Sequence, residues 1–297
     1  MSRMRRRPSL LGDRLDEYLF SYRNRHHSSS CKLVKQVFLR QRLSSCILVS
    51  IMSEEKSGDA QATIDPHLEE LFRAGVHFGY ARTRRHPRMR EFIAGIKSNV
   101  EIFQLEKVLE LFGHALTFIE DIGKQGKTIL WVGTKPAANV TIRKIAEELS
   151  HPYVDIRWLG GTLTNFDIIR KRITYWQDLI SKSKSGELEK YTKQERLKIQ
   201  REIERLTRAF EGLVRFDRMP DALFVVDTNE EVSALREATQ KQIPIVALLN
   251  SDCDPAAVAY PIPGNDNASE SIRFVLERAK EAYARGVEAK NAGNNGN

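Results

Sequence analysis

The chain has 297 residues, 41% of them hydrophobic and 29% charged, and its formal net charge is +8. This size and composition suit a soluble globular protein with one large hydrophobic core or two modest ones, and no stretch approaches the roughly 18 to 20 apolar residues that span a bilayer. The three cysteines, Cys31, Cys46 and Cys253, show neither pairing nor metal-ligand spacing, which argues against a disulfide framework and fits a reducing compartment.

Residues 1–51 account for the whole net charge. They hold 11 Lys/Arg and 3 Asp/Glu, so the rest of the chain keeps 36 of the 47 basic residues and 36 of the 39 acidic residues and is neutral. Nucleic-acid binding by the main body would therefore depend on local basic patches.

Residues 1–63 are predicted to form a disordered basic and polar extension, and three interpretations of residues 1–51 stay open. The composition changes at Met52, which favours an early start codon in the sequence and a natural start at Met52. Alternatively, the segment is a basic arm that contacts RNA, or a transit peptide, although its acidic residues argue against the last.

From residue 64 onward the sequence alternates predicted helices and strands. A helix opens at Pro66 with Asp65 as its N-cap, and two short strands, 92–96 and 100–103, follow. The apolar run 128–132 is typical of a strand in a parallel sheet that is covered on both faces. The other predicted strands are 154–158, 222–226 and 243–249. The other predicted helices are 105–122, 230–240 and 269–286, together with one that follows residues 133–135 and ends near 149.

This alternation predicts an α/β fold with an open, doubly wound, mostly parallel sheet over residues 64–290. Residues 291–297 are rich in Gly and Asn and are predicted to be a disordered tail.

A charged two-helix hairpin is predicted to interrupt the fold at residues 165–216, with a capping box at residues 164–167. Each arm has about 17–20 residues, so the hairpin would project on the order of 25–30 Å. Apolar residues in both arms repeat at spacings of four and three, which predicts a coiled-coil seam. They are Ile169, Ile173, Trp176 and Ile180 in the first arm and Ile199, Ile203, Leu206, Phe210 and Leu213 in the second.

The outer faces of the hairpin carry many basic residues, which are either a solvated surface or a docking arm for a partner protein. The predicted protein-docking residues are Arg170, Arg172, Arg201 and Arg205.

The densest basic patch is residues 82–90, with five arginines, one histidine and no acidic residue. Guanidinium groups bind phosphate oxygens and stack on bases, so this segment is predicted to contact RNA, with a solvated loop as the alternative. Residues 133–135 (GTK) follow a strand and precede a helix, where anions often bind, but they lack the patterns of nucleotide-binding loops.

Three carboxylates also follow predicted strands and could hold Mg²⁺ for phosphoryl transfer: Asp227, Asp252 and Asp254. Loop capping is the simpler interpretation, because no complete catalytic signature accompanies them. The scattered histidines form no triad or metal set by spacing. We therefore expect no enzyme activity, no metal and no cofactor.

In order along the chain, several motifs resemble the small-subunit ribosomal protein two family, in its bacterial form. The resemblance spans residues 66–280, and its most specific runs are 157–166 (RWLGGTLTNF) and 261–266 (PIPGND). The supporting motifs are 71–79 (LFRAGVHFG), 86–89 (HPRM), 133–135 (GTK), 220–223 (PDAL) and 254–255 (DP).

The resemblance implies a Rossmann-like domain with an inserted coiled-coil hairpin and a structural, non-catalytic role in the small ribosomal subunit. It implies binding to ribosomal RNA and to neighbouring small-subunit proteins, including the large messenger-binding protein. It also implies a cytoplasmic location, with an organelle of bacterial origin less favoured, no membrane association and no homo-oligomer. Two departures from the family pattern are residues 1–51 and the run 80–85 (YARTRR).

On this basis we predict a set of RNA-contacting residues, and a coiled-coil adaptor that binds no RNA remains a further alternative. The predicted phosphate contacts are Arg82, Arg84, Arg85, Arg88, Lys97, Lys135 and Arg157, with Thr162 and Asn165 as polar contacts or turn formers.

Overall fold

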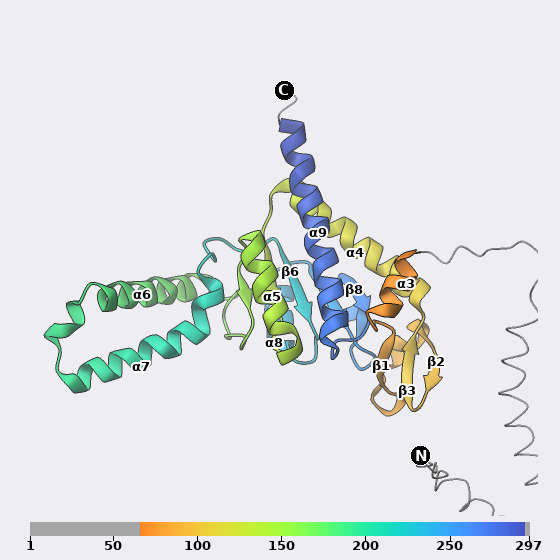
Figure 1. The fold of residues 1–297 in the computed structure, drawn as a ribbon, viewed down its shortest axis with the longest axis horizontal. Helices are drawn as coiled ribbons and strands as arrows, with labels where there is room; N and C mark the ends of the chain where they lie inside the picture. Colours follow the sequence, from red (N-terminus) through yellow and green to blue (C-terminus); the bar gives the residue numbers. More distant parts are fainter. Residues whose placement is uncertain (1–65, 295–297) are drawn as a thin grey trace, which may run out of the picture. The chain divides into compact units, whose positions relative to one another are not determined.

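The computed structural model describes residues 66–294 (Figure 1). The predictions made for residues 1–63 and for Asp65 lie outside the described residues. Within residues 66–294, no helix combines the length and the apolar character needed to cross a membrane.

The larger sheet contains five parallel strands in the order β5-β4-β6-β7-β8 (Figure 1). Its three central strands are buried at every position, as continuous apolar runs predict for a sheet covered on both faces. The chain adds β5 on one side of β4 and then β6, β7 and β8 on the other, so the predicted Rossmann-like, doubly wound fold is confirmed. The strands are β4 (Ile129–Val132), β5 (Tyr153–Val154), β6 (Ala222–Val226), β7 (Ile245–Leu249) and β8 (Tyr260–Pro263).

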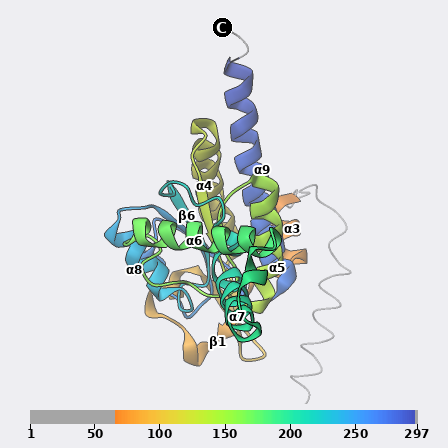
Figure 2. The same ribbon diagram turned by 90° about the vertical axis from the view of Figure 1, so that its left-hand side faces the viewer.

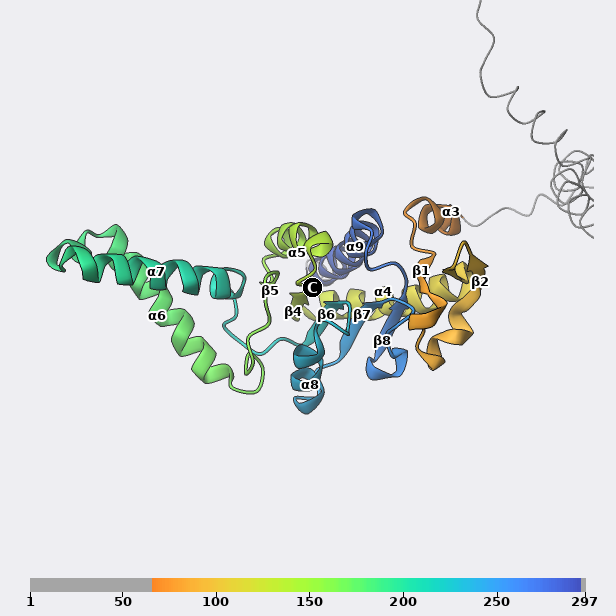
Figure 3. The same ribbon diagram turned by 90° about the horizontal axis from the view of Figure 1, so that it is seen from below.

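Strand side chains alternate between two hydrophobic cores, one on each face of the sheet. Trp131 and Phe224 belong to the core that also holds residues of α4, α5 and α9, whereas Leu130 and Val225 belong to the core with α6, α7 and α8. Seen from below, α5 and α9 lie across the strands from α8 (Figure 3). The helices are α4 (Leu105–Gln125), α5 (Pro136–Leu149), α6 (Phe166–Lys184), α7 (Lys193–Phe210), α8 (Val232–Gln240) and α9 (Ser269–Asn294).

A smaller antiparallel sheet follows helix α3 (Pro66–Arg73), with strands in the order β1-β3-β2. Strands β2 and β3 are the two that the sequence predicts, and β1 was not predicted. Ser98 and Asn99 make the turn between β2 and β3 with φ values of 51° and 66°, as tight hairpin turns require. The strands are β1 (Phe78–Ala81), β2 (Ile93–Lys97) and β3 (Val100–Phe103), and two 3₁₀ helices, η1 (Arg82–Arg84) and η2 (Pro87–Phe92), connect β1 to β2.

Helices α4 and α9 pack side by side (Figure 1, Figure 2). Two glycines permit their close approach. A Cβ on Gly123 would meet the backbone oxygen of Tyr283, and a Cβ on Gly286 would meet the backbone oxygen of Glu120. Larger residues at either position would therefore push the two helices apart.

Helix α9 runs eight residues past its predicted end at Gly286, to Asn294. The predicted disorder is therefore wrong for residues 291–294, and residues 295–297 lie outside the described part of the chain. The Gly/Asn-rich composition favours disorder, but residues 291–294 continue the helix of the preceding turns.

The hairpin consists of α6, the 3₁₀ helix η3 (Glu187–Lys190) and α7, and its seam is buried only near the sheet. Ile173 and Trp176 of α6 and Phe210 of α7 are buried, whereas Ile180 and Ile199, nearer the tip, are only half-buried. The helices are inclined to one another instead of running parallel (Figure 1, Figure 3). A continuous coiled coil therefore remains a prediction.

The predicted capping box at residues 164–167 is wrong. Asn165 is the N-cap of α6, and its side chain makes no capping hydrogen bond. The capping box lies instead at the start of α7, where the Thr192 hydroxyl accepts from the Glu195 N–H and the Glu195 carboxylate accepts from the Thr192 N–H.

Two edge strands also differ from the prediction. Strand β5 ends at Val154 and does not continue to Trp158, because the chain turns away toward the hairpin. Strand β8, which contains Pro261 and Pro263, was not predicted, yet it pairs in parallel with β7. The prolines are compatible with a strand because β8 is the last strand of the sheet.

Candidate nucleic-acid interface

The arginine segment, residues 82–90, lies between β1 and β2 and is anchored to the large sheet. Met89 is fully buried, and the His86 N–H donates to the carbonyl of Ser251, just after β7, over 2.8 Å. The segment is thus held in place while part of its charge faces solvent. Its exposed arginines that form no ion pair among the described residues are Arg82, Arg84 and Arg90.

The other two arginines of the segment are paired with carboxylates. Arg85 Nη1 lies 3.1 Å from Oε1 of Glu101, whose side chain is 0% exposed. Arg88 Nη1 lies 2.8 Å and 3.2 Å from the two carboxylate oxygens of Asp254. Burial by itself raises the pKa of Asp254, but the Ala256 N–H and the Arg88 guanidinium lower that pKa below its usual value.

The remaining predicted RNA contacts fall into two places. Lys97 is exposed at the end of β2, beside the arginine segment, whereas Arg157 and Asn165 are exposed in the loop that leads into α6. Thr162 is fully buried, and its hydroxyl donates to the Leu159 carbonyl over 2.7 Å, so it forms the turn.

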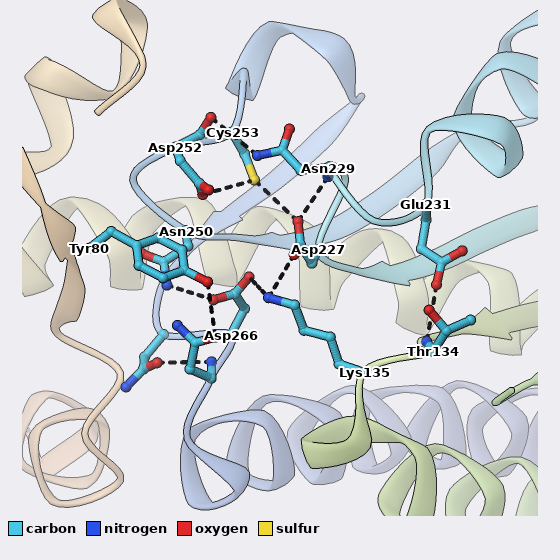
Figure 4. Close-up of polar contacts among 12 residues, drawn as sticks. Tyr80, Thr134, Lys135, Asp227, Asn229, Glu231, Asn250, Asp252, Cys253 and Asp266 are labelled. Atoms are coloured by element: carbon cyan, nitrogen blue, oxygen red, sulfur yellow. Dashed lines mark hydrogen bonds and ion pairs between the residues drawn. The ribbon is translucent and has the colours of Figure 1, made fainter. Parts of the chain in front are cut away.

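A buried polar centre lies at the carboxyl ends of β4, β6, β7 and β8, where open α/β sheets commonly bind ligands (Figure 4). The Lys135 ammonium, on a side chain 14% exposed, lies 2.6 Å from Asp227 Oδ2 and 2.6 Å from Asp266 Oδ2. Asn250 Nδ2 donates to the second oxygen of Asp266 over 2.6 Å. The protein's own ion pairs therefore occupy this end of the sheet, and Lys135 is already paired.

Opposing effects act on the charges of this centre. Burial lowers the pKa of Lys135, but the carboxylates of Asp227 and Asp266 outweigh burial and raise that pKa above its usual value. Burial also raises the pKa of Asp266, while Lys135 and Asn250 act against that increase. The lysine is therefore charged at neutral pH, and its charge offsets the cost of burying the carboxylates.

The three aspartates that could have held Mg²⁺ do not converge on one point. Asp227 and Asp252 both contact the thiol of Cys253, over 3.5 Å and 3.6 Å, but the other oxygen of Asp227 faces the ammonium just described. Asp254 lies apart and pairs with an arginine. Within residues 66–294, no group of three or more His, Cys, Asp or Glu side chains could hold a metal ion. Burial raises the pKa of Cys253 to about 12, so this thiol is a poor nucleophile at neutral pH.

Glu237 of α8 organises the loop that leads into the hairpin, a role that no motif in the sequence indicates. Its carboxylate, on a residue 9% exposed, accepts from Trp158 Nε1 over 3.0 Å and from the Gly161 N–H over 2.8 Å. It also accepts from the Leu163 N–H over 2.9 Å and from the N–H and hydroxyl of Thr164 over 3.1 Å and 3.2 Å. One side chain thus holds the loop at four residues.

The charge of Glu237 matches this role. Burial raises the pKa of its carboxyl, but the hydrogen bonds from Trp158 and from the loop N–H groups outweigh burial and lower that pKa below its usual value. A signal in the sequence was available, because Glu237 lies beside Ala234 and Ala238 on the buried face of a helix, where a carboxylate needs partners.

The basic residues predicted to dock a protein all lie on the surface of the hairpin. Arg170, Arg172 and Arg201 are exposed and form no ion pair within the described part of the chain, whereas Arg205 pairs with Glu202 over 2.6 Å. A surface ion pair of this kind contributes little to stability and leaves the guanidinium accessible.

Comparison with known proteins agrees with the fold and with the motifs. The family described as Ribosomal protein S2 matches residues 71–286. A small ribosomal subunit protein uS2 of Coprothermobacter proteolyticus is 41% identical over 223 residues, 75% of this chain and 83% of that protein. Proteins of the same name from Helicobacter acinonychis (41% over 221 residues, 74% of this chain and 90% of that protein) and Nitratiruptor sp. (40% over 223 residues, 75% and 84%) are similarly related. The chain therefore belongs to the ribosomal protein S2 family.

Proposed function

We propose that this chain is a structural, non-catalytic constituent of the small ribosomal subunit that binds ribosomal RNA and neighbouring ribosomal proteins. The observation that carries the proposal is the family match across residues 71–286, which includes the α/β domain and the hairpin. The polar centre agrees with a non-catalytic role, because ion pairs fill the end of the sheet where a substrate would bind. A ribosomal role implies a location in the cytoplasm.

The RNA-contacting surface in this proposal is the exposed arginine segment together with two further cations. Arg82, Arg84 and Arg90 are free to bind phosphate oxygens, and Lys97 extends this surface. Arg157 is a separate proposed contact in the loop that leads into α6. Three other members of the predicted set act within the protein: Arg85 holds the segment in shape, Lys135 fills the polar centre, and Thr162 forms a turn. Arg88 pairs with Asp254 but keeps an exposed side chain.

The hairpin is the proposed docking arm for a neighbouring protein or RNA helix, and the large messenger-binding protein is one such partner. The contacts that we propose on the hairpin are its exposed arginines, Arg170, Arg172 and Arg201, together with Arg205. The phosphoryl-transfer alternative loses its basis, since an ammonium neutralises Asp227 and an arginine neutralises Asp254. The adaptor alternative predicts complexes that survive RNase treatment, whereas the ribosomal proposal predicts complexes that RNase disrupts.

The first test is the distribution of the native chain on a sucrose gradient, with quantification by mass spectrometry. We expect one copy for each small subunit. Recovery of the chain only in free fractions, beside normal subunits that lack it, would contradict the proposal.

A second prediction concerns salt. Changing Arg82, Arg84 and Arg90 together to Ala should weaken binding to small-subunit ribosomal RNA and reduce the slope of log affinity against log salt by about 2 to 3, since each lost phosphate contact releases about one counterion fewer. A matched control changes Arg73, Arg273 and Arg285, which already pair with carboxylates, to Ala. Equal losses in both triple variants would show a general charge effect and remove the assignment of this surface.

A further inference from the structure

An open groove lies between the arginine segment and the loop after β7. It has a volume of about 720 Å³, within the roughly 300–1,000 Å³ range of small-ligand sites. One wall belongs to η2 and the other to the 3₁₀ helix η5 (Pro255–Ala257). The residues that line it are Pro87, Arg88, Arg90, Glu91, Phe92, Pro255 and Ala256.

Most of the groove surface is apolar and rigid. Phe92 is half-buried and packs against both hydrophobic cores, so its ring is fixed by the fold. Pro87 and Pro255 add two ring side chains that have little conformational freedom to lose on binding. Flat apolar side chains of this kind suit the face of a planar ligand.

Two guanidinium groups at the groove differ in their surroundings. Arg88 Nη1 donates to both oxygens of Asp254, and the Ala256 N–H in turn donates to Asp254 over 3.0 Å, so one end of this guanidinium is anchored before any ligand arrives. Arg90 is exposed and forms no ion pair among the described residues. One arginine therefore offers an anchored guanidinium for stacking, and the other offers a cation that no ion pair among the described residues neutralises.

We propose that this groove binds a single unstacked nucleotide of RNA. The base stacks on the apolar wall and on the plane of Arg88, and Arg90 pairs with a phosphate, because bases stack on arginine planes as well as on aromatic rings. The proposal rests on the proposed function and adds to it a site for one unpaired nucleotide, apart from contacts to helical backbone. Charge disfavours a basic peptide here, since two arginines and one acidic residue, Glu91, line the groove.

Photo-crosslinking in assembled small subunits tests the site directly. Ala256 and Ala257 are neighbouring exposed residues of η5, but only Ala256 lines the groove, so a photoreactive amino acid at each position forms a matched pair. We expect a crosslink from position 256 to one RNA nucleotide and much less from position 257. A crosslink from position 256 to a protein segment, or none from subunits that contain the chain, would overturn the nucleotide site.

Chemical probing of the RNA gives a second measurement. Ala256→Trp fills the groove, and Arg90→Ala removes the phosphate contact. In subunits that carry either change, one nucleotide that is protected in the parent should become several-fold more reactive. Ala257→Trp is the control and should leave that nucleotide protected. Unchanged reactivity in both groove variants would contradict the site. The amount of this chain in each subunit preparation separates the nucleotide site from the proposed ribosomal function. Normal incorporation with unchanged reactivity contradicts only the nucleotide site. Absence of the parent chain from subunits contradicts both proposals.

Discussion

Changing Lys135 to Met is expected to lower the free energy of unfolding by about 3–5 kcal/mol, because removal of one partner leaves buried charge uncompensated. Asp227 and Asp266 would then face each other with no cation between them. Urea unfolding at pH 7 measures the loss. Lys144→Met provides the control, since Lys144 is an exposed residue of the same helix, α5, and its replacement should change stability by no more than about 0.5 kcal/mol.

The same variant should respond to pH in a defined direction. Burial raises the pKa of Asp266, and without the ammonium nothing of comparable strength opposes burial. A carboxyl whose folded pKa is raised binds protons more tightly in the folded state, so the variant should gain stability as the pH falls through that raised pKa. Addition of Asp266→Asn should restore part of the lost stability at pH 7. If the double variant is as unstable as the sum of its single changes, the two side chains are not coupled.

Changing Glu237 to Ala is expected to cost on the order of 3 kcal/mol or more, because several buried donors lose a charged acceptor together. Hydrogen exchange should locate the damage in the loop that enters the hairpin, with faster exchange at the N–H groups of Gly161, Leu163 and Thr164. Glu230→Ala, at an exposed position just before α8, is the control and should have little effect on either measurement.

The contribution of Glu237 to the stability of the fold should also decrease in acid. Its folded pKa lies below its usual value of 4.5, so its stabilising effect is complete above about pH 4.5 and disappears as the pH falls through the lowered pKa. The stability difference between the parent and Glu237→Gln should therefore narrow in acid. A difference that stays constant from pH 7 to pH 3 would mean that the charge of this side chain does not hold the loop.

The sequence predicts the parts of the fold that are determined by residues close together in the chain. The central strands are runs of apolar residues, and the hairpin arms carry long regular spacings, so both were located from pattern alone. Strands β1 and β8 were missed because each has four residues and lies at a sheet edge, where pairing partners distant in the sequence decide the structure. The end of β5 was misplaced for the same reason, since Trp158 is drawn to a carboxylate on α8.

Site residues were harder to predict because charge alone does not reveal pairing. Five arginines at residues 82–90 look equivalent in sequence, yet Glu101 and Asp254 pair with two of them and leave three without an ion pair among the described residues. Lys135 looked like a free cation after a strand, but its partners arrive from other loops that meet only in the folded sheet. Long-range contacts therefore divide the basic residues into those that build the protein and those that remain accessible.

The prolines of β8 have a consequence for the solubility of the free chain. The Gly264 N–H donates to the Leu249 carbonyl, so the backbone nitrogen of residue 264 points toward β7. Because this direction alternates along a strand, the nitrogens of Pro261 and Pro263 point away from β7, to the open edge of the sheet. Proline has no N–H, and an incoming strand would find no donors at these positions. The two prolines therefore oppose the pairing of this edge with a strand of a second copy, and they oppose the aggregation that such pairing would start.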